Sequence, residues 1–239
     1  MSKNLYLTLS AGFADQPDRC CLQLPDGTAW SFAELDTLSG RMARVMLQQA
    51  AAGDRVLVQV SKSPEAVALY LACLRAGLVM VPLNTAYTAA ELDYFRQDAN
   101  PTVEIDDAGL RRLCLESSRV DALEEVAAVD ADCLAAILYT SGTTGRSKGA
   151  MLSHDNLRSN AETLVTAWGF TAADRLLHML PIYHVHGLFI ALGCVLMSGS
   201  SMSWHRNFSD KAAIAALPEC TVMMGVPTFY TRLLANPCL

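Results

Sequence analysis

The sequence predicts an α/β fold in which helices alternate with the strands of a mostly parallel sheet. Short apolar runs, typical of buried strands, alternate along the chain with longer segments of helical periodicity. Two helix-start patterns of the form S/T-x-x-E, Ser31 with Glu34 and Thr88 with Glu91, fall between the apolar runs. This order is typical of a parallel sheet covered by helices, because a parallel strand needs a crossover to return to the sheet.

The first half of the chain carries clear start and stop signals for these elements. Pro64 suits the first turn of a helix, where its missing N–H costs nothing, and Gly77 suits the end of that helix. The run at 55–60 is almost continuously apolar, as expected for a strand covered on both faces. The predicted helices span 31–49, 64–75 and 88–99, and the predicted strands span 55–60 and 79–83.

The second half repeats the pattern after an acidic stretch, 120–128, that we expect to be helical. Leu157, Ala161 and Leu164 recur at helical spacing and predict one apolar face on a helix over 153–168. The predicted strands span 134–139, 175–180, 201–204 and 221–224, and the further predicted helices span 187–197, 210–217 and 227–234.

The ten residues 140–149, TSGTTGRSKG, are the most informative stretch of the chain. Glycines let several backbone N–H groups point at one anion, and hydroxyl groups add further donors. Lys148 adds a positive charge, and the helix expected from Ser153 would add the field of its N-terminus. The spacing is not that of GxxxxGK[ST], because Arg146 and Ser147 separate the glycine from the lysine. The composition predicts a loop that holds the phosphates of a nucleotide.

Three stretches resemble the adenylate-forming superfamily of acyl-CoA synthetases, peptide-synthetase adenylation domains and luciferases. YTSGTTGRSKGAMLSH, at 139–154, resembles the phosphate-loop signature of that superfamily. LPIYHVHGLF, at 180–189, and MGVPTFYTRLL, at 224–234, are more similar to the malonyl-CoA synthetases than to long-chain or coumarate ligases. The resemblance runs from about residue 30 to the end of the chain. It implies a ligase that uses ATP, Mg²⁺ and coenzyme A in fatty acid metabolism, with malonate as the acid.

The resemblance also assigns roles to residues of the loop. Lys148 would neutralise charge as pyrophosphate leaves, whereas Arg146 is expected to be solvated. The residues expected to wrap the β- and γ-phosphates are Thr140, Ser141, Gly142, Thr143, Thr144 and Gly145, together with Lys148.

His184 and His186 have three interpretations. On an extended segment, residues two apart would share a face. A zinc site would need a third ligand, and no Cys, Asp or Glu lies at ligand spacing nearby. Both rings could instead simply bond backbone groups. By resemblance, His186 would hold the free carboxylate of malonate and His184 would act near the reacting carboxylate.

The segment 223–227 has two interpretations. By resemblance, Met224, Gly225 and Val226 would form a wall of the acyl pocket, between Met223 and Pro227. The alternative is a core strand that runs into a helix. Tyr139 is expected to be a packing residue at the end of the sheet. The chain offers no predicted metal ligands.

Later motifs of the family, which hold adenine, ribose and magnesium, do not occur before Leu239. We therefore expect residues 1–239 to be a partial N-terminal AMP-binding domain without a C-terminal domain, inactive alone and able to associate through an exposed apolar face. The segment 100–132 is shorter than its usual counterpart, which has another strand and helix. The alternatives are a non-catalytic nucleotide-binding fragment, or a ligase for a medium-chain or aryl acid.

Charge and composition exclude several other functions. The net charge is −6 and no basic stripe occurs, so nucleic acid is not an expected partner. The longest apolar stretch, 187–197, is too short for a membrane span, which takes about 20 residues. The eight scattered cysteines and the absence of a signal sequence predict free thiols in the cytoplasm.

Overall fold

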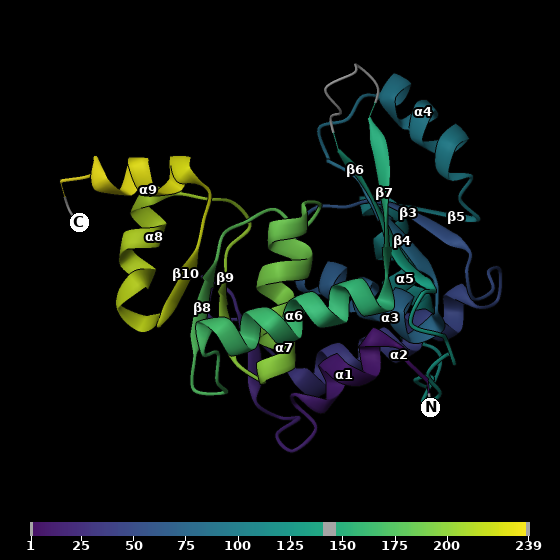
Figure 1. The fold of residues 1–239 in the computed structure, drawn as a ribbon, viewed down its shortest axis with the longest axis horizontal. Helices are drawn as coiled ribbons and strands as arrows, with labels where there is room; N and C mark the ends of the chain where they lie inside the picture. Colours follow the sequence, from purple (N-terminus) through teal and green to yellow (C-terminus); the bar gives the residue numbers. More distant parts are fainter. Residues whose placement is uncertain (1, 141–146, 238–239) are drawn as a thin grey trace. The chain divides into compact units, whose positions relative to one another are not determined.

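The computed structural model describes residues 2–140 and 147–237. The chain forms two compact units. Unit 1 comprises residues 1–8 and 34–159, and unit 2 comprises residues 9–33 and 160–239. Helices alternate with strands along the chain, as the sequence predicts (Figure 1).

Unit 1 contains a five-stranded, mostly parallel sheet in the order β5-β3-β4-β6-β7. The pairs β3–β5, β3–β4 and β4–β6 are parallel, whereas β6 and β7 are antiparallel. The strands are β3 (Arg55–Gln59), β4 (Val79–Pro82), β5 (Val103–Asp106), β6 (Leu134–Thr140) and β7 (Lys148–Ser153).

Two helices of unit 1, α3 and α4, begin and end where the sequence signals predict, whereas α1 and α5 were not predicted. Ser63 caps α3, Pro64 occupies its first turn, and Gly77 ends it with a φ of 69°. Thr88 and Glu91 form the predicted capping box at the start of α4. Nearly every residue of α3 is buried, so this helix forms the centre of the core of unit 1. The helices are α1 (Leu5–Ala11), α2 (Phe32–Met46), α3 (Pro64–Ala76), α4 (Ala89–Ala99) and α5 (Asp107–Ser117), with α1 and α2 continuing across the unit boundary.

The segment 100–132 differs from its prediction in two respects. It does contain a strand and a helix, β5 and α5, despite its short length. Residues 121–130 are irregular, so the helix predicted over 120–128 is wrong. Tertiary contacts replace the helix there: the N–H of Leu123 donates to the carbonyl of Gly40, and the N–H of Ala127 donates to the carbonyl of Arg75.

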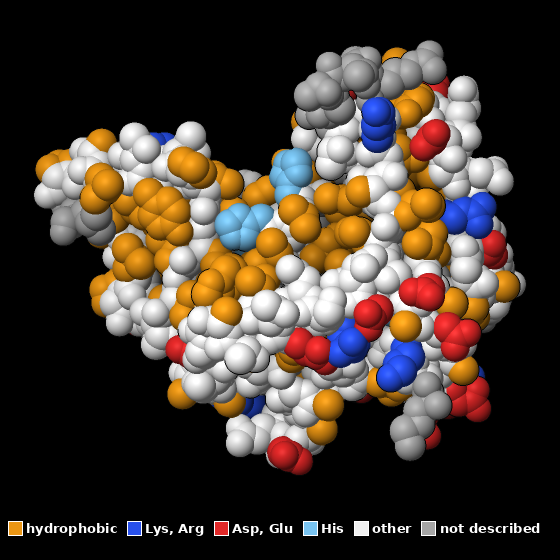
Figure 2. Space-filling view, in the orientation of Figure 1, with side chains coloured by type: hydrophobic (Ala, Val, Ile, Leu, Met, Phe, Trp, Pro, Cys, Tyr) orange, Lys and Arg blue, Asp and Glu red, His pale blue; other side chains and the backbone are white. Residues whose placement is uncertain are grey.

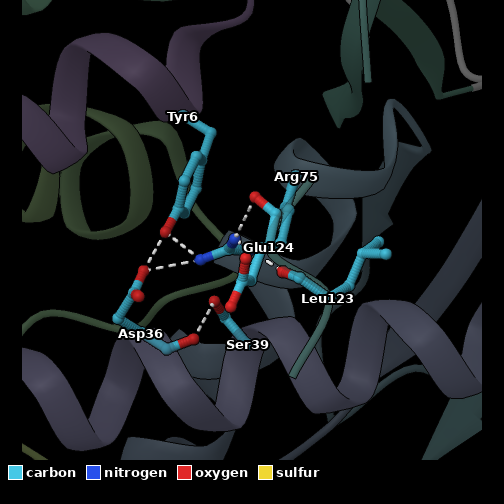
Figure 3. A network of polar contacts seen from close by, with 6 residues as sticks. All are labelled: Tyr6, Asp36, Ser39, Arg75, Leu123 and Glu124. Carbon is cyan, nitrogen blue, oxygen red and sulfur yellow. Dashed lines mark hydrogen bonds and ion pairs between the residues drawn. The ribbon is translucent and has the colours of Figure 1, made fainter. Parts of the chain in front are cut away.

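The buried side chain of Arg75 fixes this irregular segment (Figure 3). Its guanidinium donates to the carbonyl oxygens of Leu123, at 2.8 Å, and Glu124, at 3.4 Å. The other end of the guanidinium pairs with Asp36 at 2.7 Å and contacts the hydroxyl of Tyr6. Because a buried charge is costly unless it is paired and hydrogen-bonded, these contacts of the terminal guanidinium nitrogens hold the segment in one conformation.

Unit 2 contains a second five-stranded sheet, in the order β10-β8-β9-β1-β2, with only β1 and β2 antiparallel. The sequence predicted β8, β9 and β10 but not the short hairpin of β1 and β2. The strands are β1 (Cys20–Gln23), β2 (Ala29–Ser31), β8 (Arg175–His178), β9 (Ser201–Trp204) and β10 (Val222–Met224).

Two helices of unit 2 depart from α-helical geometry, the π-helix η1 and the short 3-10 helix η2. The predicted helix 187–197 is a π-helix, η1, followed by the α-helix α7. A cluster of Leu177, Met179, Ala213 and Leu233 joins α8 and α9 to the sheet, and both helices lie beside β10 (Figure 1). The helices are α6 (His154–Trp168, which begins in unit 1), η1 (His186–Ala191), α7 (Leu192–Ser198), α8 (Asp210–Ala216), η2 (Leu217–Glu219) and α9 (Pro227–Leu234).

Candidate functional site

Unit 1 contains the two strands that flank the phosphate-loop motif. β6 ends at Thr140 and β7 begins at Lys148, and these two residues pair across the antiparallel strands. Both are exposed, so a hydroxyl and an ammonium group stand at the two ends of the loop, with Cβ atoms about 5 Å apart. The other predicted phosphate ligands lie outside the described residues; they are Ser141, Gly142, Thr143, Thr144 and Gly145.

An aromatic cluster fixes the first of these strands. The ring of Tyr139 lies 4.5 Å from that of Phe95 and 6.3 Å from that of Tyr94, measured between centroids. The hydroxyl of Tyr139 donates to the carboxylate of Asp98 at 2.5 Å. Burial, followed by the contact with Asp98, raises the pKa of Tyr139. The prediction that Tyr139 is a packing residue at the end of the sheet is confirmed.

The same helix, α4, also anchors the far end of the loop. The hydroxyl of Tyr94 donates to the carbonyl of Ser147 at 2.7 Å. Gly149 lies against the neighbouring strand so closely that a Cβ would be 2.8 Å from the side chain of Ile137. Tyr94 and the motif residue Gly149 therefore hold the base of the loop in place rather than bind a ligand.

The helix that follows the motif lies away from the loop. β7 runs back along β6, so that Ser153 pairs with Leu134 at the opposite end of the strand from Thr140. Six strand residues separate the loop from the start of α6, a distance of about 20 Å. The prediction that this helix N-terminus adds to the field at the loop is wrong, because the sequence reading missed β7.

His154, the last residue of the motif, is a structural residue for which the sequence predicted no role. Its side chain is fully buried, and its Nδ1 accepts a hydrogen bond from the N–H of Leu5 at 3.1 Å. Burial lowers the pKa of His154 to about 4. The ring is therefore neutral at pH 7 and ties α1 to α6.

Unit 2 presents its predicted site residues at one edge of its sheet. Met224, His178 and Trp204 end the parallel strands β10, β8 and β9 and lie in register with one another. The segments with His184, His186 and Val226 all follow these carboxyl ends. Open parallel sheets bind ligands at that edge, so the predicted acid-binding segments share one location within unit 2.

The two predicted histidines do not lie on an extended segment. The chain turns from Ile182 onward, Val185 has helical φ and ψ of −49° and −44°, and His186 opens η1. Residues two apart on a helical turn face different directions, so the prediction that His184 and His186 share a face is wrong. The ring of His184 lies 4.6 Å from that of Tyr183.

His184 is exposed and His186 is half-buried, whereas the three other histidines of the chain are buried. Figure 2 shows histidine side chains at the surface with hydrophobic side chains around them. Partial burial lowers the pKa of both His184 and His186. Both rings are therefore neutral at pH 7 in the absence of a ligand, and each can donate one hydrogen bond.

A third histidine, which the sequence reading missed, supports this segment. His178 is 1% exposed, and its Nε2 donates to the carbonyl of Gly187 at 3.0 Å. Gly187 packs so tightly that a Cβ would lie 2.1 Å from the carbonyl oxygen of Pro181. A buried ring on one side and a close backbone contact on the other fix the first turn of η1, which carries His186. The only sequence signal was a histidine within the predicted strand 175–180.

The residues predicted as an acyl wall continue directly from β10. Met224 is buried, whereas Val226 is 37% exposed and precedes α9. A Cβ on Gly225 would be 3.1 Å from the side chain of Phe229, so only a glycine fits without adjustment. α9 also exposes Tyr230 and Leu234, which form part of an apolar surface. The segment 223–227 is therefore a strand that leads into a helix, and it also lies at an edge of the sheet that is open to a ligand.

Residues 2–140 and 147–237 contain neither a cluster of metal ligands nor a membrane-spanning helix. No three His, Cys, Asp or Glu side chains in that part of the chain are grouped to hold a metal ion. None of its helices is long and apolar enough to cross a membrane. The seven cysteines that the structure describes are free thiols.

The sequence matches the family described as AMP-binding enzyme over residues 9–238. It is 32% identical to a feruloyl-CoA synthase of Amycolatopsis sp, over 88% of this chain and 46% of the relative. It is also 32% identical to the mitochondrial malonate–CoA ligase of Bos taurus, over 85% of this chain and 40% of the relative. The chain spans about half the length of the curated relatives that it matches.

Solved structures resemble the fold closely. ATP-bound MatB from Rhodopseudomonas palustris superposes with a TM-score of 0.92 at 44% identity, over 100% of this chain and 52% of MatB. The o-succinylbenzoate CoA synthetase of Bacillus subtilis, in complex with its acyl-adenylate intermediate, gives 0.85 at 26% identity, over 96% of this chain and 64% of that chain. The predicted α/β architecture is that of these proteins.

Proposed function

Because the chain belongs to the AMP-binding enzyme family, we propose that it is the phosphate-binding and acid-binding part of an ATP-dependent malonate–CoA ligase. In the proposed reaction, a carboxylate of malonate attacks the α-phosphorus of ATP and displaces pyrophosphate, giving an acyl-adenylate. The thiol of coenzyme A then attacks the acyl carbon and displaces AMP, which leaves malonyl-CoA.

The proposal assigns the phosphates to the loop between β6 and β7. Thr140 and the residues up to Gly145 would donate to the β- and γ-phosphates, and Lys148 would balance the charge of the departing pyrophosphate. The paired positions of Thr140 and Lys148 support this assignment, because their separation is set by the hairpin. Mg²⁺ is implied by the family, but the described residues offer no group of ligands for it, so no step is assigned to it.

The proposal assigns the acid to the carboxyl edge of the sheet in unit 2. His186 would donate to the free carboxylate of malonate, and His184 would lie near the reacting carboxylate. Met224, Gly225 and Val226 would form a wall beside the methylene group. The lowered pKa of His186 supports a neutral donor in the free protein, and a bound carboxylate would raise that pKa. The histidine pair is the observation that carries the choice of malonate.

A second candidate is a ligase for an aryl acid. The feruloyl-CoA synthase of Amycolatopsis sp is as similar in sequence as the malonate ligase of Bos taurus, at 32% identity. The apolar residues Met224 and Val226 would suit an aromatic acid or a medium-chain acid. An apolar tail gains nothing from an imidazole at its end, which favours malonate.

Binding of ATP and of malonate to His186→Ala and Lys148→Gln, measured by calorimetry, tests the assignment. A hydrogen bond to a charged group contributes about 1.5–3 kcal/mol, so His186→Ala should weaken malonate binding roughly 10- to 100-fold and leave ATP binding unchanged. Lys148→Gln should do the reverse. Equal losses for both ligands in either variant would contradict it.

A product assay identifies the preferred acid if the chain forms a thioester. The purified chain would be given ATP, Mg²⁺ and CoA with malonate, ferulate, octanoate and acetate in competition. Malonyl-CoA as the main product supports the malonate ligase, and feruloyl-CoA or octanoyl-CoA supports the second candidate. We expect no thioester from this chain alone, because the motifs implied for adenine and ribose are not among its residues; saturable ATP binding without any thioester is the outcome of the nucleotide-binding alternative as well.

A further inference from the structure

We propose that three arginines of unit 1 form a second anion site, which binds the phosphate group of a small molecule independently of the phosphate loop. Arg41 and Arg44 project from α2, and Arg119 follows the end of α5. All three line one open hollow of about 490 Å³, together with Ser118, Val120 and Asp121.

The charges in this hollow are unbalanced. Asp121 is the single carboxylate among its lining residues, against three guanidinium groups. Arg41 and Arg44 lie one helical turn apart, where like charges repel each other and destabilise a helix. None of the three arginines has a carboxylate within ion-pair distance among the described residues. A bound anion would relieve this repulsion.

Part of the hydrogen-bonding capacity of these side chains is also unused. The Nε of Arg41 is buried and has no hydrogen-bond partner in the part of the chain that the structure describes. Arg44 donates to the carbonyls of Asp121, at 2.8 Å, and Ala122, at 3.2 Å, which orients its guanidinium. The side chain of Arg119 is exposed. Guanidinium groups match the oxygens of phosphate with paired donors, so phosphate is the anion that this set favours.

The wall of the hollow is rigid, as a binding site requires. Residues 121–123 lie against α2 at Gly40, where a Cβ would be 3.0 Å from the carbonyl oxygen of Leu123. The N–H of Leu123 donates to the carbonyl of Gly40 at 3.1 Å. The guanidinium of Arg75 also donates hydrogen bonds to the carbonyl oxygens of Leu123 and Glu124 (Figure 3). The arginines therefore need little reorganisation to receive a ligand.

The test follows the arginine Nε–H resonances of the purified chain by NMR during titration with inorganic phosphate at constant ionic strength. We expect saturable shifts at Arg41 and Arg44, and at least fivefold weaker binding in Arg41→Gln and Arg119→Gln. Arg111→Gln, an equal charge change at an exposed position of α5, should alter the affinity less than twofold. Lys148→Gln should leave it unchanged, which separates this site from the proposed ATP loop.

Two outcomes would overturn the proposal: shifts that grow linearly without saturation, or a loss in Arg111→Gln as large as that in Arg41→Gln. Arg119 is exposed, so its variant remains informative even if Arg41→Gln fails to fold. A parallel titration with glycerol 3-phosphate identifies the source of the phosphate. Tighter binding than that of inorganic phosphate indicates a phosphomonoester ligand, and equal or weaker binding indicates free phosphate.

Discussion

The phosphate-loop hairpin of unit 1 and the histidine segment of unit 2 are held in place by different means. The hairpin depends on side chains of α4, since Tyr94 bonds the carbonyl of Ser147 and Phe95 packs on Tyr139. The histidine segment has side-chain support as well, since Gly187 accepts a hydrogen bond from His178, but it also depends on a close backbone contact between Gly187 and Pro181. Atoms can be removed from a supporting side chain in steps, whereas a close backbone contact leaves no room for an added atom. Loss of a supporting side-chain group should therefore have a graded effect in either unit, whereas an added atom at Gly187 should have an abrupt effect in unit 2.

The largest effect is expected for Gly187→Ala, which would break the histidine segment. The added Cβ would be 2.1 Å from the carbonyl oxygen of Pro181, so the backbone must move. We expect a loss of about 3 kcal/mol in the free energy of unfolding, the upper end of the usual range for overpacking, measured with urea. Gly193→Ala is the matched control in the same region, because its Cβ would meet Ala161 at an ordinary 3.5 Å. If both variants keep wild-type stability, the backbone contact at Gly187 does not constrain the segment.

Unit 1 should show a dependence of stability on pH that arises from His154. Its pKa falls from 6.5 unfolded to about 4 in the folded protein, so the unfolded chain binds the proton more readily between these values. The stabilisation is complete above pH 6.5 and is lost progressively as the pH falls toward 4, by about 3 kcal/mol.

The variant His154→Asn isolates the contribution of His154 to the pH dependence of stability. Its amide oxygen lies near the position of Nδ1 and can still accept from the N–H of Leu5, but it does not titrate. Urea unfolding at pH 7 and pH 4.5 should show a smaller difference for the variant than for the wild type. An identical difference in the two proteins would show that other groups cause the pH dependence.

His178→Phe tests how far the histidine segment of unit 2 depends on the hydrogen bond from His178 to Gly187. It keeps an aromatic ring beside Trp204, whose centroid is 4.6 Å away, but leaves the buried carbonyl of Gly187 without its donor. We expect a loss of about 1–3 kcal/mol, together with faster hydrogen exchange at Leu188. His178→Gln, which retains a donor near the position of Nε2, should recover much of the loss. Equal exchange rates in the two variants would mean that the hydrogen bond does not fix η1.

The smallest effect is expected for Tyr94→Phe in unit 1. The change keeps the ring in the aromatic cluster and removes only the hydrogen bond to Ser147, for a loss of about 1 kcal/mol. ATP affinity should fall a few-fold at most, as calorimetry can measure. Tyr230→Phe in unit 2, whose hydroxyl lies 3.5 Å from the carbonyl of Met223, is a control that should change neither quantity. Complete loss of ATP binding in Tyr94→Phe would mean that the loss of one supporting contact disrupts the hairpin as abruptly as a substitution at Gly187 disrupts the histidine segment.

Much of the fold was predictable because local signals agree with the tertiary structure. Pro64, Gly77 and the capping box of Thr88 and Glu91 mark helix ends that the structure confirms. β1, β2 and β5 were missed, and their length of three or four residues is not the cause, because β4, β8, β9 and β10 are equally short and were predicted. β7 was missed because its Gly149 reads as part of a loop.

The errors at the candidate site have tertiary causes. The helix predicted over 120–128 does not form because Gly40 and Arg75 bond the backbone of that segment. His184 and His186 were expected on an extended segment, and a turn into a π-helix was not foreseeable from their spacing. The support from His178 to Gly187 joins two segments through one buried hydrogen bond, for which local sequence carries no pattern.

The most direct test of the proposed acid site is an NMR titration of His186 with malonate and, separately, with propionate. Propionate has nearly the same size but replaces one carboxylate by a methyl group. We expect malonate to raise the pKa of His186 above its lowered value in the free protein, and we expect propionate not to do so. An equal response to both acids, or a response confined to His184, would contradict the assignment of His186 to the free carboxylate of malonate.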